Sequence, residues 1–253
     1  MGIYLTGIAW VVGAAIAAGF VGYLVRKFGW DEGRRDNNDA AGQVFTIVGG
    51  LHAVLVAFIL ISLFDSASAA RDGSYHEADS LVAAVWAADS LGPEVKDEVR
   101  KLSAEYITTV EQREWPLMAG DEAVPDAGWT QLDRLRKAVE KASSDDDWVR
   151  ERKAEAATQL WQVYEARQNR LNAVEGGRVG GVVWFALILG SLISVLLPNL
   201  FGGTRLAAHL VIVSTLAGTI TLLLFAIYQL QNPFGGGVRI PPDAFTAARA
   251  RIV

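Results

Sequence analysis

The stretch AAGQVFTIVGGLHAVLVAFILISLF, residues 40–64, contains no Asp, Glu, Lys or Arg. Three further stretches without these four residue types occupy positions 3–25, 179–197 and 206–230. A helix needs about 20 predominantly apolar residues to cross a bilayer core about 30 Å thick. All four stretches reach or approach that length, so the sequence predicts a membrane protein with four transmembrane helices.

The first stretch also has features of a cleavable secretory signal, because Ala15-Ile16-Ala17 offers small residues of the cleavage type. However, no Lys or Arg precedes the stretch, and it is longer than the apolar region of about 7 to 15 residues that signals use. We therefore expect a retained helix. Four retained helices place both termini and the large centre on one side of the membrane.

Charge is concentrated in the centre of the chain. Residues 65–178 contain 23 of the 28 acidic residues and 15 of the 23 basic residues, a net charge of −8. An acidic extramembrane region argues against a nucleic-acid partner. The chain has no cysteine, which excludes a disulfide framework, thiol catalysis and a thiolate metal site.

The centre reads as a set of long helices. Residues 65–91 lack proline and repeat apolar residues at helical spacing, so we expect the second membrane helix to continue well beyond the bilayer. Gly92-Pro93 ends that helix and opens another. Residues 116–129 contain two prolines and two glycines and predict a surface loop. Two further helices are predicted at 130–142 and 148–175.

The expected fold class is an all-α membrane protein with four transmembrane helices, in which long helices 2 and 3 extend into a cytosolic helical domain. The expected boundaries are 1–64 for transmembrane helices 1 and 2, 65–178 for the extramembrane helical domain, 179–230 for transmembrane helices 3 and 4, and 231–253 for a C-terminal tail.

Basic residues predict the orientation in the membrane. Seven arginines flank the face that carries the centre, and five basic residues lie in the connections at the other face. The former are Arg71, Arg167, Arg170, Arg178, Arg239, Arg249 and Arg251; the latter are Arg26, Lys27, Arg34, Arg35 and Arg205. Because basic residues favour the cytoplasmic side, this excess predicts a cytoplasmic centre.

Signatures of catalysis or metal binding are scarce. No phosphate-binding glycine loop, nucleophile elbow or paired-histidine zinc motif is present. His76, Glu77 and Asp79 could contact a metal, but their position on a charged helix predicts a solvated face. Residues 145–147 are three aspartates at a predicted helix start, where the helix dipole favours carboxylates. We expect no enzyme activity, no metal and no cofactor.

Polar and apolar residues of the second run suggest a pore. Leu51, Leu55, Phe58, Ser62 and Asp65 repeat at three- and four-residue spacing and so share one helix face. Several copies around an axis would form an apolar constriction with a charged mouth, although ordinary helix packing explains the apolar members equally well. His52 lies in the same run, where an interhelical hydrogen bond or a polar pathway would explain it.

The tail carries a resemblance to a known family. Residues 229–245 read QLQNPFGGGVRIPPDAF, with Asn232, Pro233, Phe234 and Gly236 in the pattern Asn-Pro-Phe-x-Gly. This pattern resembles the tail of the bacterial family called bestrophin-like. A second similar stretch comprises residues 58–64, Asp65, Arg71 and Glu77-Ala78. With the four runs and the helical centre, the likeness covers most of the chain.

The resemblance implies a channel. Bestrophins proper are pentameric ion channels, mainly for anions, whose second membrane helix lines the pore. By this likeness Phe58 and Ser62 would lie at a hydrophobic neck, and Asn232, Pro233 and Phe234 in a turn that fixes the tail to the cytosolic helices. Animal bestrophins follow the motif with an acidic calcium-binding run, whereas residues 236–239 supply no acid, so calcium gating is not implied.

Two functions therefore follow from the sequence. The first is an oligomeric, pentameric channel in the bacterial inner membrane that conducts ions passively through a pore lined by the second helix, with membrane lipid, further copies and small ions as its partners. The second is a non-conducting signalling or scaffold protein that acts through its helical domain. The long paired helices, the acidic surface and the glycine pairs 176–177 and 180–181 are compatible with the second function.

Overall fold

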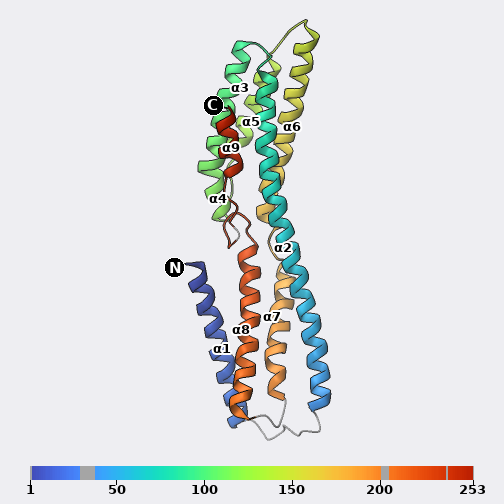
Figure 1. Ribbon diagram of the computed structural model, residues 1–253, viewed down its shortest axis with the longest axis vertical. Coiled ribbons are helices and arrows are strands. Elements are labelled where there is room, and N and C mark those ends of the chain that lie inside the picture. The colour runs from blue at the N-terminus through green and yellow to red at the C-terminus, as the bar shows by residue number, and fades with distance from the viewer. Residues whose placement is uncertain (1, 29–37, 201–204, 238, 253) are drawn as a thin grey trace. The chain divides into compact units, whose positions relative to one another are not determined.

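The computed structural model describes residues 2–28, 38–200, 205–237 and 239–252, and every regular element in these ranges is helical (Figure 1). The predicted all-α class is therefore confirmed, but the third apolar run does not extend into the helical centre as one helix, because one helix ends at Gly176 and the next begins at Gly181. The chain divides into two units, Met1–Leu63 with Val179–Gln231 and Phe64–Arg178 with Asn232–Val253. Arg34 and Arg35, which contributed to the predicted orientation, lie outside the described residues.

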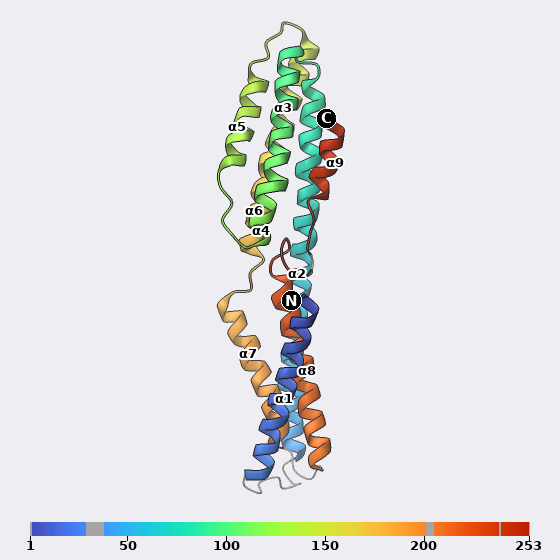
Figure 2. The same cartoon turned by 90° about the vertical axis from the view of Figure 1, so that its left-hand side faces the viewer.

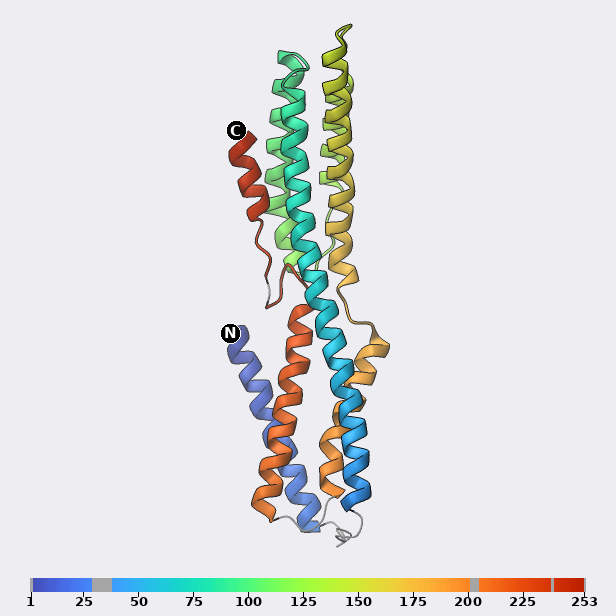
Figure 3. The same cartoon turned by 45° about the vertical axis from the view of Figure 1, so that its right-hand side comes forward.

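The first unit contains four helices that are long and apolar enough to cross a membrane. These are α1 (Ile3–Phe28), the N-terminal part of α2 (Asn38–Ala88), α7 (Gly181–Leu196) with the short turn η3 (Leu197–Leu200), and α8 (Leu206–Leu230). α1 packs along α8 (Figures 2 and 3). Gly7 allows this approach, because a Cβ there would lie 2.7 Å from the Phe225 ring.

Most large apolar side chains of these helices face outward. Tyr4 is 85% exposed and Val182 is 83% exposed in the single chain. Such extensive apolar exposure is incompatible with water and requires lipid or further protein around the helices. The first unit therefore has the surface of a membrane protein.

The predicted long second helix is present as α2, a single helix of 51 residues. It contains no proline, and it ends at Ala88, shortly before the Gly92-Pro93 pair. Gly92 has a φ of 98°, a left-handed conformation that glycine adopts without steric cost. Pro93 then occupies the first turn of α3 (Pro93–Thr109), where its fixed φ suits a helix start.

The second unit is a bundle with its own apolar core. The C-terminal part of α2 is joined there by α3, the π-helical turn η2 (Val110–Glu114), α4 (Trp115–Ala119), α5 (Ala127–Glu140), α6 (Asp147–Gly176) and α9 (Asp243–Ile252). The core contains completely buried side chains from α2, α3, α6 and α9, among them Leu81, Ile107, Val163 and Phe245. α9 packs against α3 and η2.

The loop predicted over residues 116–129 is shorter than expected at both ends. Pro116 lies in the first turn of α4, and Gly128 lies in the first turn of α5. Pro116 does not begin a separate helix, because α3, η2 and α4 follow one another without a break and the wider π-helical turn accommodates the proline. Neither Pro116 nor Gly128 therefore lies in the loop itself.

The three aspartates 145–147 behave as a helix start. α6 begins at Asp147, and Asp146 Oδ1 accepts a hydrogen bond of 2.9 Å from the Trp148 amide. This contact satisfies one of the free amides of the first turn. Among the described residues, no three His, Asp or Glu side chains are placed to hold a metal ion together.

Candidate functional site

The predicted pore stripe lies on an uncovered face of α2. Leu51 is 68% exposed and Phe58 is 67% exposed, Ser62 and Asp65 are also exposed, and Leu55 is half-buried. The opposite face is covered, because Val56 and Leu63 pack with Leu187 of α7 and Ile227 of α8. One protomer therefore packs α2 from one side and leaves the stripe available to lipid or to other copies.

His52 does not belong to this exposed stripe. Its Nε2 lies 3.2 Å from the Ser191 hydroxyl of α7. The Ser191 hydroxyl donates its single proton to the Leu187 carbonyl at 2.6 Å, so the His52 Nε2–H is the donor to Ser191 Oγ. The interhelical hydrogen bond that the sequence allowed is present, and it joins α2 to α7.

The second unit contains a cluster of four buried charges that we call the charge cluster: Glu77, Glu114, Arg167 and Arg170. Arg170 Nε and Nη2 donate to the two carboxylate oxygens of Glu77 at 2.7 and 3.0 Å. Glu114 Oε2 accepts from Arg170 Nη2 at 3.0 Å and from Arg167 Nη1 at 2.6 Å. The two acids and two bases balance, so the cluster has no net charge.

The π-helical turn η2 brings Glu114 into this cluster. Pro116 has no amide hydrogen and cannot donate the usual helical bond to the residue four positions earlier. The helix widens by one residue just before it, and the Trp115 amide bonds to the Val110 carbonyl. Glu114 is consequently turned inward and is 1% exposed.

Aromatic rings enclose the two arginines. The Arg167 guanidinium lies 4.6 Å from the Trp129 ring centroid, and the Arg170 guanidinium lies 5.6 Å from both the Trp115 and Phe245 centroids. Cation–π contact is strengthened when the cation is withdrawn from water. The rings therefore supply part of the solvation that the arginines lose on burial.

The pKa values of the buried groups depend on the neighbouring charges of the cluster. Burial alone would raise the pKa of the Glu114 carboxyl, but hydrogen bonds and charges from Arg167 and Arg170 bring it below its ordinary value. Burial raises the pKa of Tyr106 well above its ordinary value, and the charge of Glu77 raises it further. At neutral pH the cluster thus contains an ionised Glu114 and two arginines, and the neutral Tyr106 next to it donates a hydrogen bond to Glu77.

The prediction of a solvated face at His76, Glu77 and Asp79 is wrong for Glu77. His76 and Asp79 are exposed, whereas Glu77 is 0% exposed. Glu77 lies on the same helix face as the buried residues Ser74 and Leu81, and this spacing was the available signal. Its charge argued against burial, because its ionic partner Arg170 lies 93 residues away in sequence.

The tail motif forms a turn against α4. The Asn232 side-chain amide donates to the Met118 carbonyl at 2.9 Å, while its Oδ1 accepts from the Phe234 and Gly235 amides at 2.9 and 3.1 Å. The Pro233 carbonyl accepts from the Ile240 amide at 3.0 Å, and the Gly236 amide donates to the Asn232 carbonyl. The turn is therefore held by its own backbone and by the bundle.

Phe234 is the apolar anchor of this turn. It is completely buried, and its ring meets Trp115 edge-on at 5.2 Å between centroids. The Trp115 indole N–H donates to the Ile240 carbonyl at 2.9 Å. Sequence reasoning selected Gly236 but missed Gly235, where a Cβ would lie 1.9 Å from the Ala119 carbonyl oxygen.

Four helices long and apolar enough to cross a bilayer, in a chain that also contains a helical bundle, indicate an α-helical membrane protein. The family model of the Bestrophin-like domain matches residues 12–245, and the chain belongs to the bestrophin-like family. Neither the curated proteins nor the solved structures contain a match to this chain.

Replacing Glu77 by alanine is expected to destabilise the bundle by about 3–5 kcal/mol, because Arg170 would stay buried with less compensation. Thermal and denaturant unfolding of the purified protein in detergent measures the change. The matched control is Asp79→Ala, two residues along the same helix, which breaks only the exposed pair with Arg251 and should cost about 1 kcal/mol or less. Equal losses in the two variants would contradict the central role of the cluster.

The contribution of Glu114 to stability should depend on pH. Its pKa is lowered in the folded state, so its contribution is complete above the ordinary value of 4.5 and is lost as pH falls through the lowered pKa. The stability difference between the wild type and Glu114→Gln is thus expected to be largest at neutral pH and to narrow below pH 4.5. Denaturant unfolding at several pH values measures it, and a constant difference would refute the assignment.

Alanine at Gly235 is expected to detach the tail, because the new Cβ would overlap the Ala119 carbonyl. Trypsin should then cleave at Arg239 and Arg249 about tenfold faster, as expected when local opening costs about 1.4 kcal/mol less. Gly73→Ala is the control, since a Cβ at Gly73 meets nothing within 4 Å. Unchanged cleavage in Gly235→Ala would mean that the turn tolerates a side chain.

Proposed function

We propose that this chain forms an oligomeric, pentameric ion channel that conducts passively through a pore lined by α2. The observation that carries the proposal is the exposed stripe on α2, whose opposite face is already packed against α7 and α8. Membership of the bestrophin-like family supports a related channel architecture. The proposed place of action is the bacterial inner membrane, with the helical bundle in the cytoplasm.

The chemistry of the stripe suits a narrow apolar constriction. Leu51, Leu55 and Phe58 would form successive rings around the axis, and such rings oppose ion passage when they shed water. Ser62 and Asp65 follow on the same face and would form polar and acidic rings at the mouth. A ring of carboxylates attracts cations, so Asp65 is the proposed determinant of cation preference.

The proposed function involves binding and passage of ions without a chemical step. We accordingly assign no catalytic residue and no cofactor to this chain. The proposed partners are membrane lipid, further copies of the chain and small permeant ions.

A non-conducting scaffold is the second candidate. It is favoured by aromatic side chains that α6 leaves on the surface of the bundle, notably Trp148, Trp161 and Tyr164. Trp161 and Tyr164 are stacked 5.3 Å apart and line a surface pocket with Trp129. Exposed aromatic side chains are common where proteins bind partners. In this function α2 would pack without forming a conducting axis.

Currents through a planar bilayer distinguish the two functions. With the purified protein under asymmetric KCl, we expect unitary currents, and Phe58→Ala should raise the conductance or the leak by widening the constriction. Asp65→Asn should move the reversal potential away from the potassium potential, because it removes the acidic ring. Trp86→Phe, which changes none of the proposed ring residues, serves as the control variant.

Silence across voltage, pH and calcium, from protein shown to be oligomeric, would favour the scaffold. Currents that both variants leave unchanged would remove Phe58 and Asp65 from the conduction path. Cross-linking and native mass spectrometry of the same preparation measure the number of subunits, for which we expect five.

A further inference from the structure

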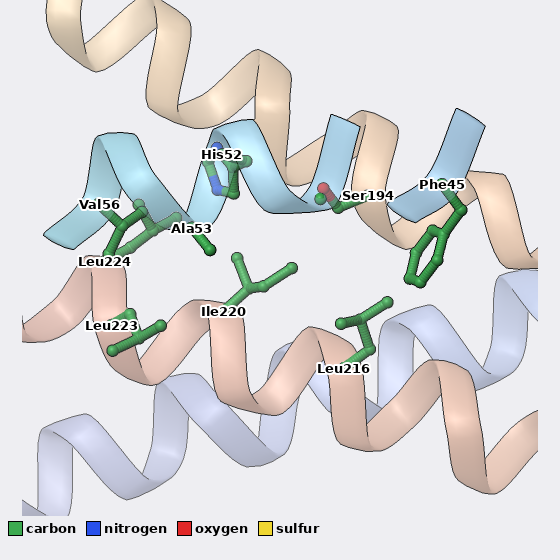
Figure 4. A pocket seen from close by; sticks show the side chains of 10 residues that line it. Phe45, His52, Ala53, Val56, Ser194, Leu216, Ile220, Leu223 and Leu224 are labelled. Carbon is green, nitrogen blue, oxygen red and sulfur yellow. The ribbon is translucent and has the colours of Figure 1, made fainter. Parts of the chain in front are cut away.

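The first unit contains a partly enclosed cavity of about 150 Å³ between α2, α7 and α8. Figure 4 shows side chains of α2 and α8 facing one another across it, with Ser194 reaching in from α7. Phe45, Val56, Leu216 and Ile220 provide much of its apolar lining. All of its lining residues belong to the apolar part of the chain that is suited to cross a membrane.

One polar group in this cavity lacks a partner. Ser194 is 4% exposed, and its hydroxyl has no hydrogen-bond partner within the described part of the chain. The hydroxyls of Ser191 and Thr221 differ in this respect, because Ser191 bonds to the Leu187 carbonyl and Thr221 bonds to the Ala217 carbonyl. A buried hydroxyl without a partner carries a free-energy cost that a suitable ligand would remove.

The dimensions of the cavity restrict the ligand. An apolar cavity of roughly 150 Å³ accommodates a molecule the size of benzene. Charged and strongly polar molecules are disfavoured, because the walls supply few polar atoms: Ser194 Oγ and the His52 ring, of which His52 Nε2 already bonds to Ser191.

We propose that this cavity is a binding site for small lipophilic alcohols and phenols. The apolar body of the ligand lies between Val56 and Ile220, and its hydroxyl forms a hydrogen bond with Ser194 Oγ. The site differs from the proposed pore, because its lining residues lie on the face of α2 opposite to Leu51 and Phe58. Binding is therefore measurable whether or not the protein conducts ions.

Photolabelling tests the proposal. The purified protein in lipid nanodiscs is irradiated with the diazirine alcohol 3-azioctanol, and labelled residues are located by mass spectrometry. We expect labels on the cavity residues of α2, α7 and α8, and we expect hexanol to compete for them better than hexane. In Ser194→Ala the advantage of hexanol should fall about three- to tenfold, which is the worth of one hydrogen bond.

Two adjacent glycines provide a matched pair of variants. Gly49 lines the cavity and Gly50 does not, and a Cβ at either position meets nothing within 4 Å. Gly49→Val should fill the cavity and abolish the specific label, whereas Gly50→Val should keep it. Because valine has the same helix propensity at both positions, a difference between the variants reports on the cavity and not on folding.

Three results would overturn the proposal. The first is label spread evenly over outward-facing residues such as Trp10 and Phe185. The second is equal labelling of Gly49→Val and Gly50→Val. The third is labelling of the same cavity by a diazirine-bearing phospholipid acyl chain that hexanol does not displace, which would assign the cavity to bilayer lipid.

Discussion

The bidentate ion pair between Glu77 and Arg170 is the constraint on which the bundle depends. Neither side chain reaches solvent, so each charge exists in the interior only because the other is present. The pair connects α2 to α6, and Glu114 extends the connection to η2. Three segments far apart in sequence must therefore adopt one register together. Helices that pack only through apolar side chains can shift along one another, whereas a bidentate carboxylate–guanidinium contact fixes their register.

The rest of the bundle is arranged around these charges. The Trp115 ring lies against the Arg170 guanidinium and makes T-shaped contacts with Phe234 and Phe245, and its indole N–H donates a hydrogen bond to the Ile240 carbonyl. The tail is thus part of the shielding of the charge cluster. This arrangement gives a physical reason for an Asn-Pro-Phe turn in the second unit: Asn232 sets the backbone that delivers Phe234.

The sequence predicts those features that depend on a local pattern. Membrane helices need length and the absence of charge, so the run that includes Leu51 and Phe58 was recognisable, and so was the long helix without proline. The burial of Glu77 could not be predicted, because a carboxylate in a helix normally faces solvent and its partner Arg170 is distant in sequence. Glu114 depends on a π-helical turn that no spacing rule predicts. The stripe on α2 could be predicted as a face, but what covers it depends on other copies and on lipid.

The position of the tail in the chain affects the order in which the protein can be built. Trp115 and Met118 are synthesised more than 110 residues before their partners Ile240 and Asn232. Between them the ribosome must produce α6, α7 and α8, of which α7 and α8 are long and apolar enough to cross a bilayer. The bundle therefore cannot close its core around Arg170 until residues 232–245, which follow all four candidate membrane helices, have been synthesised. Until then the core of the bundle in the nascent chain lacks Phe234 and Phe245, and the burial of these two side chains completes it.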